Sequence, residues 1–265
     1  MSALGWAVFS AATLLLLPAA SDEASHPALG CTGPGEITRF TVRLPNTARA
    51  IRSGKTLVIV AIGSSSTRGV GASDPAHTYP ALLDEELRRR WPQLEVTVIN
   101  KGVSGEIASQ MLARFERDVL PYRPQLVIWQ TGSNQVLRSG EIEGYADTIR
   151  EGIGRLKAVS ADVVLMDPQF APRVLAQPMH MPIVDSISAV ADEMKVAVFR
   201  RFALMRHWIS SGQYKIEEII SSDGLHMNDV SYSCIARLLA DSLVAAAEPP
   251  LGTGDGRAGT RDASR

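Results

Sequence analysis

The sequence predicts an α/β protein: a three-layer α/β/α, flavodoxin-like domain built on a five-stranded parallel sheet. Two patterns carry this prediction. Short apolar segments rich in β-branched residues recur along residues 56–199, and segments with helical spacing of apolar residues separate them. Strands that alternate with helices at this spacing form a parallel sheet with helices on both faces. Residues 56–247 show no internal repeat and no second core, so we expect one domain there.

The first expected strand, 56–62, contains a run of apolar residues that stops at Gly63. An apolar run without polar alternation indicates a strand that is buried on both faces. The remaining strands are expected at 96–100, 125–131, 162–166 and 196–199. One more short strand is expected at 40–44, within an N-terminal arm of residues 21–55.

Helices are expected between the strands, because apolar residues recur there at helical spacing and prolines mark several helix ends. The expected helical ranges are 79–91, 107–119, 141–159, 183–194, 202–210 and 227–247. Residues 248–265 are rich in Gly, Pro and charged residues, a composition typical of a disordered tail.

The composition is that of a folded protein without a strong charge bias. The chain has 265 residues, of which 45% are hydrophobic, enough for a full core. A formal net charge of -1 argues against a nucleic-acid partner recognised by bulk charge. Nothing in the sequence specifies the oligomeric state.

Residues 1–20 have the pattern of a signal peptide. The apolar run 6–20 is shorter than the roughly 18–20 residues of a membrane span, and the small residues 18–21 suit signal-peptidase cleavage. We therefore expect an exported protein, periplasmic or secreted, with no stable membrane span in the mature chain. Because no Lys or Arg precedes the apolar run, an uncleaved N-terminal anchor is the alternative.

The chain contains two cysteines, Cys31 and Cys234. In an exported protein such a pair can form a disulfide, which here would join the N-terminal arm to the last helix. Two unrelated buried thiols are the alternative. Without histidines nearby the pair does not make a zinc site, and the sequence implies no metal or other cofactor.

Small polar residues follow each of the first three expected strands. Serines occupy 64–66, glycines occupy Gly102 and Gly105, and an amide side chain stands at Asn134. These loops meet at one edge of a parallel sheet, where ligands bind. The segment before the last helix adds Asp223 and His226. A serine, a histidine base and a carboxylate that orients it form a nucleophilic triad, and backbone and amide N–H groups can hold an oxyanion.

The four segments resemble, in chain order, the sequence blocks of the SGNH, or GDSL-like, hydrolase family. The family pattern Gly-Asp-Ser-x-Thr is matched by 63–67, the second block by 100–105, Gly-x-Asn-Asp by 132–135 and Asp-x-x-His by 223–226. The resemblance implies that Ser65 is the nucleophile, with His226 and Asp223 completing the triad. It also implies an oxyanion hole formed by the backbone of Ser65 and Gly105 and the side chain of Asn134.

The resemblance implies a metal-independent hydrolase of carboxylic esters or thioesters. Two positions depart from the family: Ser64 replaces the Asp before the nucleophile, and Gln135 replaces the acid after the third-block Asn. No long apolar lid segment is visible, so we expect short acyl groups, such as acetyl esters on small molecules or carbohydrate. An acyltransferase acting on a glycan and a non-catalytic carbohydrate-binding protein on the same fold are the alternatives.

Overall fold

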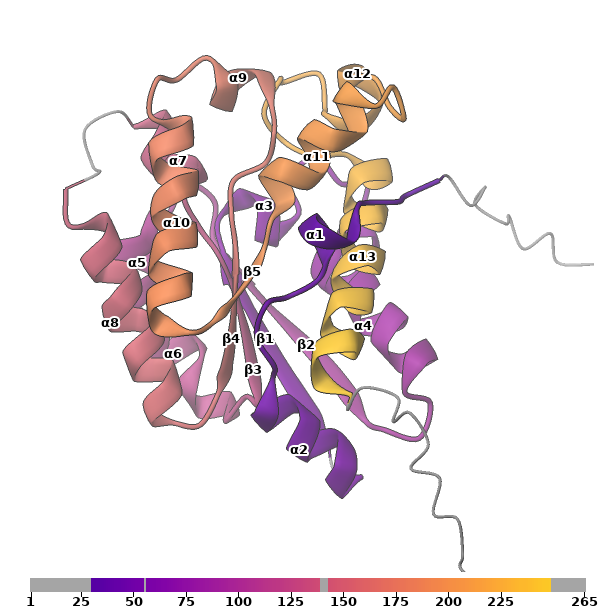
Figure 1. The fold of residues 1–265 in the computed structure, drawn as a ribbon, viewed down its shortest axis with the longest axis vertical. Coiled ribbons are helices and arrows are strands. Elements are labelled where there is room, and N and C mark those ends of the chain that lie inside the picture. Colours follow the sequence, from indigo (N-terminus) through magenta and orange to yellow (C-terminus); the bar gives the residue numbers. More distant parts are fainter. Residues whose placement is uncertain (1–29, 55, 139–142, 249–265) are drawn as a thin grey trace, which may run out of the picture. The chain divides into compact units, whose positions relative to one another are not determined.

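The computed structural model contains the expected five-stranded parallel sheet, in the order β2-β1-β3-β4-β5 (Figure 1). It describes residues 30–54, 56–138 and 143–248. The strands are β1 (Leu57–Gly63), β2 (Val96–Gly102), β3 (Leu126–Gln130), β4 (Asp162–Met166) and β5 (Ala197–Phe199). The α/β fold class predicted from the sequence is therefore confirmed.

Strand β1 lies between β2 and β3, and this position explains its apolar run. Every β1 residue except Val58 is buried, and β3 is buried throughout, including Trp129. In the register of the sheet, Gly63 lies beside Gly102, and Ile62 lies beside Trp129. The carboxyl ends of these three strands therefore meet at one edge, which is where the polar loops begin.

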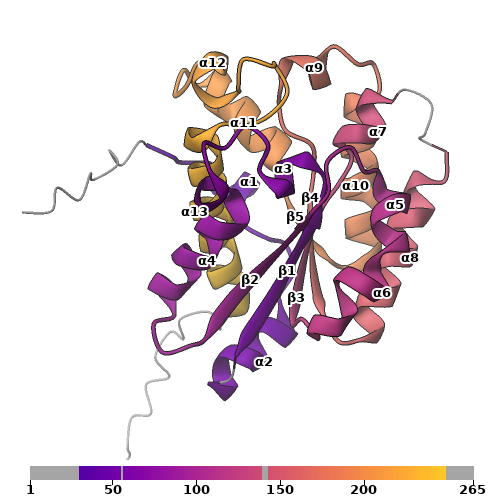
Figure 2. The same cartoon turned by 180° about the vertical axis from the view of Figure 1, so that it is seen from behind.

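Helices cover both faces of the sheet (Figures 1 and 2). One layer contains α5 (Ala108–Ala113), α6 (Phe115–Asp118), α8 (Tyr145–Ala158) and α10 (His180–Met194). The other contains α1 (Gly35–Thr38), α2 (Pro45–Ser53), α4 (Tyr79–Arg90), α11 (Arg201–Ser210) and α13 (Asp229–Ala247). Short helices α3 (Ser65–Arg68), α7 (Ser133–Leu137), α9 (Pro172–Leu175) and α12 (Ile216–Ile219) belong to the loops at the carboxyl edge. Two single turns of 3-10 helix, Pro75–His77 and Leu120–Tyr122, complete the described elements.

Helix α13 is the main helix of its layer. Among the described residues it is the one helix long and apolar enough to cross a membrane, but 67% of its apolar window is buried within the fold. Its N-cap is Asn228, whose side chain accepts a hydrogen bond from Ser231 N at 3.3 Å. Burial of most of its length identifies α13 as a core helix.

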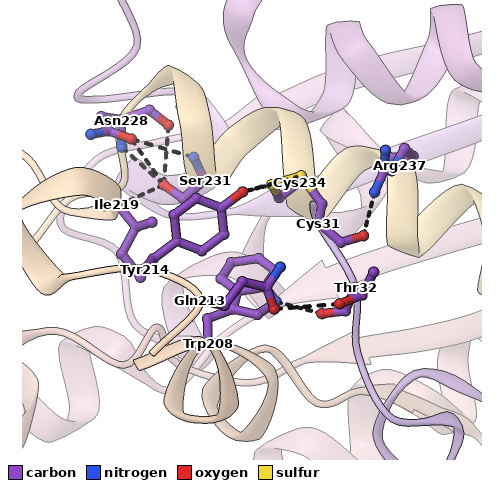
Figure 3. The surroundings of a disulfide bond; sticks show 10 residues. All are labelled: Cys31, Thr32, Trp208, Gln213, Tyr214, Ile219, Asn228, Ser231, Cys234 and Arg237. Carbon is purple, nitrogen blue, oxygen red and sulfur yellow. Dashed lines mark hydrogen bonds between the residues drawn. A yellow bond between two sulfur atoms is a disulfide. The ribbon is translucent and has the colours of Figure 1, made fainter. Parts of the chain in front are cut away.

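A disulfide between Cys31 and Cys234 ties the N-terminal arm to α13 (Figure 3). Close to it, Trp208 Nε1 donates to Thr32 O at 2.8 Å, and Arg237 donates to Cys31 O. The arm is therefore held by one covalent bond together with hydrogen bonds to its backbone.

Two expectations about the elements were wrong. Residues 40–44 form no strand: Leu44 N donates to Ala246 O at the end of α13, and Pro45 then starts a helix, so this segment is bonded to a helix end. The helix expected at 107–119 is divided at Arg114 into α5 and α6, because the Arg114 guanidinium turns inward to bond the carbonyls at the strand ends.

Several predictions lie outside the described residues. These are the signal peptide 1–20, the arm before Gly30, the first residues of the helix expected at 141–159, and the tail beyond Glu248.

Candidate active site

Ser65 is the first residue of α3, immediately beyond β1. The turn needs Gly63, because a Cβ there would lie 2.1 Å from Thr67 Oγ1 and 2.8 Å from Gln130 Oε1. Only glycine allows the strand and the short helix to approach so closely. Ser65 is partly exposed, whereas its neighbours Ser64 and Ser66 are buried. The turn therefore presents one of the three serines at the surface of the sheet edge.

The neighbouring serines anchor this turn through their side chains. Ser64 N and Ser64 Oγ donate to Gln130 Oε1 at 2.9 and 3.0 Å, and Ser66 Oγ donates to Gln169 Oε1 at 3.5 Å. Ser64 stands at the N-cap of α3, but its side chain makes no capping hydrogen bond to the helix. Helix α3 has a single turn, and buried amide oxygens at the ends of β3 and β4 take up the hydroxyls instead.

The structure brings Ser65, His226 and Asp223 together. His226 Nε2 lies 2.9 Å from Ser65 Oγ, and His226 Nδ1 is hydrogen-bonded to Asp223 Oδ2. Asp223 Oδ1 accepts from the backbone N–H groups of Leu225 and His226, both at 2.9 Å. The β-bridge between Ile220 and Met227 closes the loop that carries both side chains. The imidazole is thus held between a hydroxyl and a carboxylate.

The electrostatics of this loop favour an ionised Asp223. Burial alone would raise the pKa of Asp223, but the hydrogen bonds from His226 and Leu225 outweigh it and hold the pKa below its usual value. A carboxylate at Nδ1 favours the imidazole tautomer that carries its proton there. Nε2 is then free to accept the proton of Ser65 Oγ–H.

Gly71 is a residue that the sequence interpretation missed. Its φ is +94°, and a Cβ there would lie 2.2 Å from Met227 O and 2.6 Å from Ser221 Oγ. A side chain at Gly71 would therefore push the loop of His226 away from the turn that carries Ser65. The sequence signal that would have found this contact is the glycine pair Gly69 and Gly71, just after the serine turn.

The residues expected to hold an oxyanion lie on the next two loops. Asn134 Nδ2 donates to Glu106 O at 2.8 Å, and Arg138 Nη2 donates to Gly105 O at 2.7 Å. These two bonds tie the loop after β2 to helix α7. An Asn amide carries two N–H groups, so one serves Glu106 and the second can serve a ligand.

The structure also separates the two candidate glycines after β2. Gly102 N donates to Asn100 Oδ1 at 2.9 Å, so its N–H group is engaged within the loop. Asn100 Nδ2 in turn donates to Thr67 O at 2.8 Å, which joins β2 to helix α3. Gly105, with a φ of +81°, is therefore the better placed backbone donor.

Arg114 is a second residue that the sequence interpretation missed. It is 6% exposed, and its guanidinium donates to Lys101 O at 2.8 Å, to Gly63 O at 3.3 Å and to the Glu106 carboxylate at 2.7 Å. It thereby joins the ends of β1 and β2 to the loop of Gly105. Nothing in the sequence distinguished this arginine from the surface arginines around it.

The two positions that depart from the family pattern are both buried. Ser64 is 1% exposed and Gln135 is 4% exposed.

Within the described residues, no group of three or more His, Cys, Asp and Glu side chains is arranged to hold a metal ion.

The sheet and the four loops at its carboxyl edge are those of SGNH/GDSL-type enzymes, and the chain is a carboxylic ester hydrolase of this class. It belongs to the non-GDSL lipase-like family, whose family model matches residues 30–249.

Known relatives are esterases of several kinds. An arylesterase of Vibrio mimicus is 26% identical over 167 residues, which cover 63% of this chain and 78% of the relative. An acetylxylan esterase of Geobacillus stearothermophilus is 27% identical over 146 residues, which cover 49% of this chain and 67% of the relative.

Solved structures show the same fold. A two-domain esterase active on acetylated mannans superimposes with a TM-score of 0.64 at 21% identity, covering 80% of this chain. The match spans 58% of that two-domain protein. The structure of TesA superimposes with a TM-score of 0.61 at 22% identity, covering 71% of this chain and 99% of TesA.

Proposed function

We propose that Ser65, His226 and Asp223 form a catalytic triad that hydrolyses short-chain carboxylic esters through an acyl-enzyme. The observation that carries the proposal is the continuous hydrogen-bonded chain from Ser65 Oγ through both nitrogens of His226 to Asp223. Residues 161 positions apart in sequence reach hydrogen-bond distance at the sheet edge where ligands bind. Nucleophile, base and orienting acid are then in the geometry that acyl transfer requires.

In the acylation step, Ser65 Oγ attacks the ester carbonyl carbon while His226 Nε2 takes the hydroxyl proton. Asp223 stabilises the imidazolium that forms. Negative charge develops on the carbonyl oxygen. The backbone N–H groups of Ser65 and Gly105 and the side-chain amide of Asn134 donate hydrogen bonds to this oxygen.

Collapse of this intermediate releases the alcohol, which takes the proton from His226 and leaves the acyl group on Ser65. Water then attacks the acyl carbonyl, with His226 again acting as the base, and the carboxylic acid leaves as Ser65 is restored. No other reactant is needed for this cycle.

For the substrate, we propose a short acyl ester, such as an acetyl group on a carbohydrate. The acetylxylan esterase relative and the structural likeness to an esterase active on acetylated mannans support this choice. Ser65 is partly exposed and Asp223 is half-exposed, so solvent can reach the site. An open site of this kind suits an acyl group that is carried on a bulky alcohol.

We also propose that the protein is exported. A disulfide between Cys31 and Cys234 supports this location, because such bonds persist in oxidising compartments. Protein purified from the exported fraction should gain about two daltons when its single disulfide is reduced. An unchanged mass would contradict the proposal.

The test of function compares wild type with Ser65→Ala on p-nitrophenyl esters of rising chain length and on acetylated xylan and mannan oligosaccharides. We expect Ser65→Ala to lower kcat by at least about 10⁴-fold on every active substrate. The matched control is Ser64→Ala, which should keep most of the activity because Ser64 N still bonds Gln130. Equal activity in wild type and Ser65→Ala would contradict the triad, and acetate transferred to an added glycan rather than released would indicate an acyltransferase.

A further inference from the structure

Gln169 is a buried residue at the carboxyl edge that the catalytic cycle does not use. It lies just beyond β4 and is 1% exposed. Its side chain reaches three other segments: Oε1 accepts from Ser133 Oγ at 2.8 Å and from Ser66 Oγ at 3.5 Å, and Nε2 donates to Leu225 O at 3.0 Å. One amide therefore joins the segments that follow β1 and β3 to the segment that precedes α13.

Each of these partners is the immediate chain neighbour of a residue in the proposed catalytic machinery. The pairs are Ser66 with Ser65, Ser133 with Asn134, and Leu225 with His226. A shift of Gln169 would therefore move the nucleophile, the oxyanion donor and the base relative to one another, although Gln169 itself touches none of the three.

Arg201 fixes the orientation of this amide. It is fully buried at the start of α11; its Nη2 donates to Gln169 Oε1 at 3.1 Å and its Nε donates to Asp167 O at 2.9 Å. A guanidinium carries donors only, so the amide oxygen must face Arg201 and the amide nitrogen must face Leu225. Hydrogen bonds to a charged group are also stronger than neutral ones.

The contacts differ in strength. An amide oxygen has two lone pairs, and three donors converge on Gln169 Oε1. The bond from Ser66 is the longest and hence the weakest of the three. The links to Ser133, Arg201 and Leu225 are the ones that fix the geometry.

We propose that Gln169 is a positioning residue, braced by Arg201, that holds the helix of Asn134 and the loop of His226 in register around Ser65. The inference rests on the proposed triad and concerns a residue outside it. Misplacement by about 1 Å at a catalytic centre can cost about 10²-fold in rate, so a side chain that sets this register affects kcat rather than substrate binding.

The first test is Gln169→Met, which keeps the length of the side chain and removes its hydrogen bonds. We expect kcat on p-nitrophenyl acetate to fall roughly 10–100-fold with KM nearly unchanged. The matched control is Gln125→Met at the opposite end of β3, where Gln125 Oε1 accepts from Val58 N and Gln125 Nε2 donates to Arg123 O. That variant loses the same kinds of bond and should keep the kcat of wild type.

A double-mutant cycle distinguishes positioning from general loosening of the fold. Ser133→Ala cuts only the link from Gln169 to the helix of Asn134, and we expect a smaller loss of kcat than in Gln169→Met. If both act through the same bond, the double variant should lose little more than Gln169→Met alone. Independent structural damage would instead give losses that multiply.

The outcomes separate this inference from the proposed function. A folded Gln169→Met protein with the kcat of wild type, or multiplicative losses in the cycle, would overturn the positioning role while Ser65→Ala remained inactive. An active Ser65→Ala enzyme would remove the triad itself. If Gln169→Met does not fold, Ser133→Ala decides: its kcat should fall at constant KM, and an unchanged kcat contradicts the proposal.

Discussion

The carboxyl edge of the sheet and the N-terminal arm are both held to the rest of the fold, but by different means. At the carboxyl edge, buried amide and guanidinium groups such as Gln130, Gln169 and Arg114 bond the ends of successive segments. The arm is held covalently by the disulfide to Cys234, with hydrogen bonds from Trp208 and Arg237 to its backbone beside it (Figure 3). Hydrogen bonds have preferred directions, whereas a cross-link mainly restricts the unfolded chain. The first region therefore sets geometry, and the second sets stability.

This comparison is tested most strongly at the oxyanion hole. Asn134→Ala should lower kcat by about 10²–10³-fold, because it removes a side-chain amide that we propose donates to the developing charge. The free energy of unfolding should change by much less than the activation free energy of the reaction. Ester hydrolysis and thermal unfolding of the same preparation measure the two quantities.

The control for Asn134→Ala is Arg138→Met. Both residues tether the loop of Gly105, but only Asn134 is proposed to donate to the oxyanion. We expect a much smaller loss of kcat in Arg138→Met. Equal losses in the two variants would mean that Asn134 acts by holding the loop, and would remove it from the oxyanion hole.

The second prediction concerns the arm. Replacing both Cys31 and Cys234 by alanine should cost about 2–5 kcal/mol of unfolding free energy, since the bond closes a loop of 203 residues. The kcat should stay that of wild type at temperatures where the variant is folded. Denaturant unfolding and initial rates check both halves.

A matched variant for the arm is Tyr214→Phe. The Tyr214 hydroxyl lies 3.6 Å from Cys234 Sγ, and its ring packs against Trp208. Removing the hydroxyl keeps the ring and the disulfide, so the stability should fall far less than in the double alanine variant. A fall in kcat on loss of the disulfide would show that the arm also sets the geometry of the site, against the comparison drawn above.

The two regions also differ in how well the sequence predicted them. Ser65, Asn134, Asp223 and His226 stand in short motifs at the ends of predictable elements, so chain order alone places them at one edge. Gln169 stands in a Pro-containing loop, where an isolated glutamine looks like any surface residue. Its role comes from partners on four segments far away in sequence, and no local pattern contains that information.

The same reasoning explains the errors in the fold. The sheet was predictable because strand burial follows from the apolar runs themselves. The break at Arg114 was not, because helical spacing of apolar residues continues across it. The side chain of Arg114 instead bonds the carbonyl oxygens of Gly63 and Lys101, at the ends of β1 and β2. Residues 40–44 have a strand-like composition, but the sheet has its five strands without them.

Asp167, which lies beneath the carboxyl edge next to Arg201, should make the stability of the fold depend on pH. Burial raises the pKa of Asp167 to about 7, although the backbone N–H of Phe202 and the charge of Arg201 favour its ionised form. The pKa of this carboxyl is thus higher in the folded protein than its ordinary value of 3.8. Its contribution to stability is complete below pH 3.8 and is lost as the pH rises through about 7.

Asp167→Asn should therefore flatten the stability profile between those two pH values, because the amide does not titrate and its oxygen can still accept from Phe202 N. Thermal unfolding of both proteins across this range measures the difference. Asp223→Asn is the comparison of opposite sign: the pKa of Asp223 is lowered, so its contribution is present above its usual pKa and lost as the pH falls. Parallel stability profiles for wild type and Asp167→Asn would contradict this prediction, because they would mean that ionisation of the buried Asp167 carboxyl does not lower the free energy of unfolding. The cross-linked cysteines do not titrate, so the double alanine variant should be less stable at every pH, with a stability profile parallel to that of wild type.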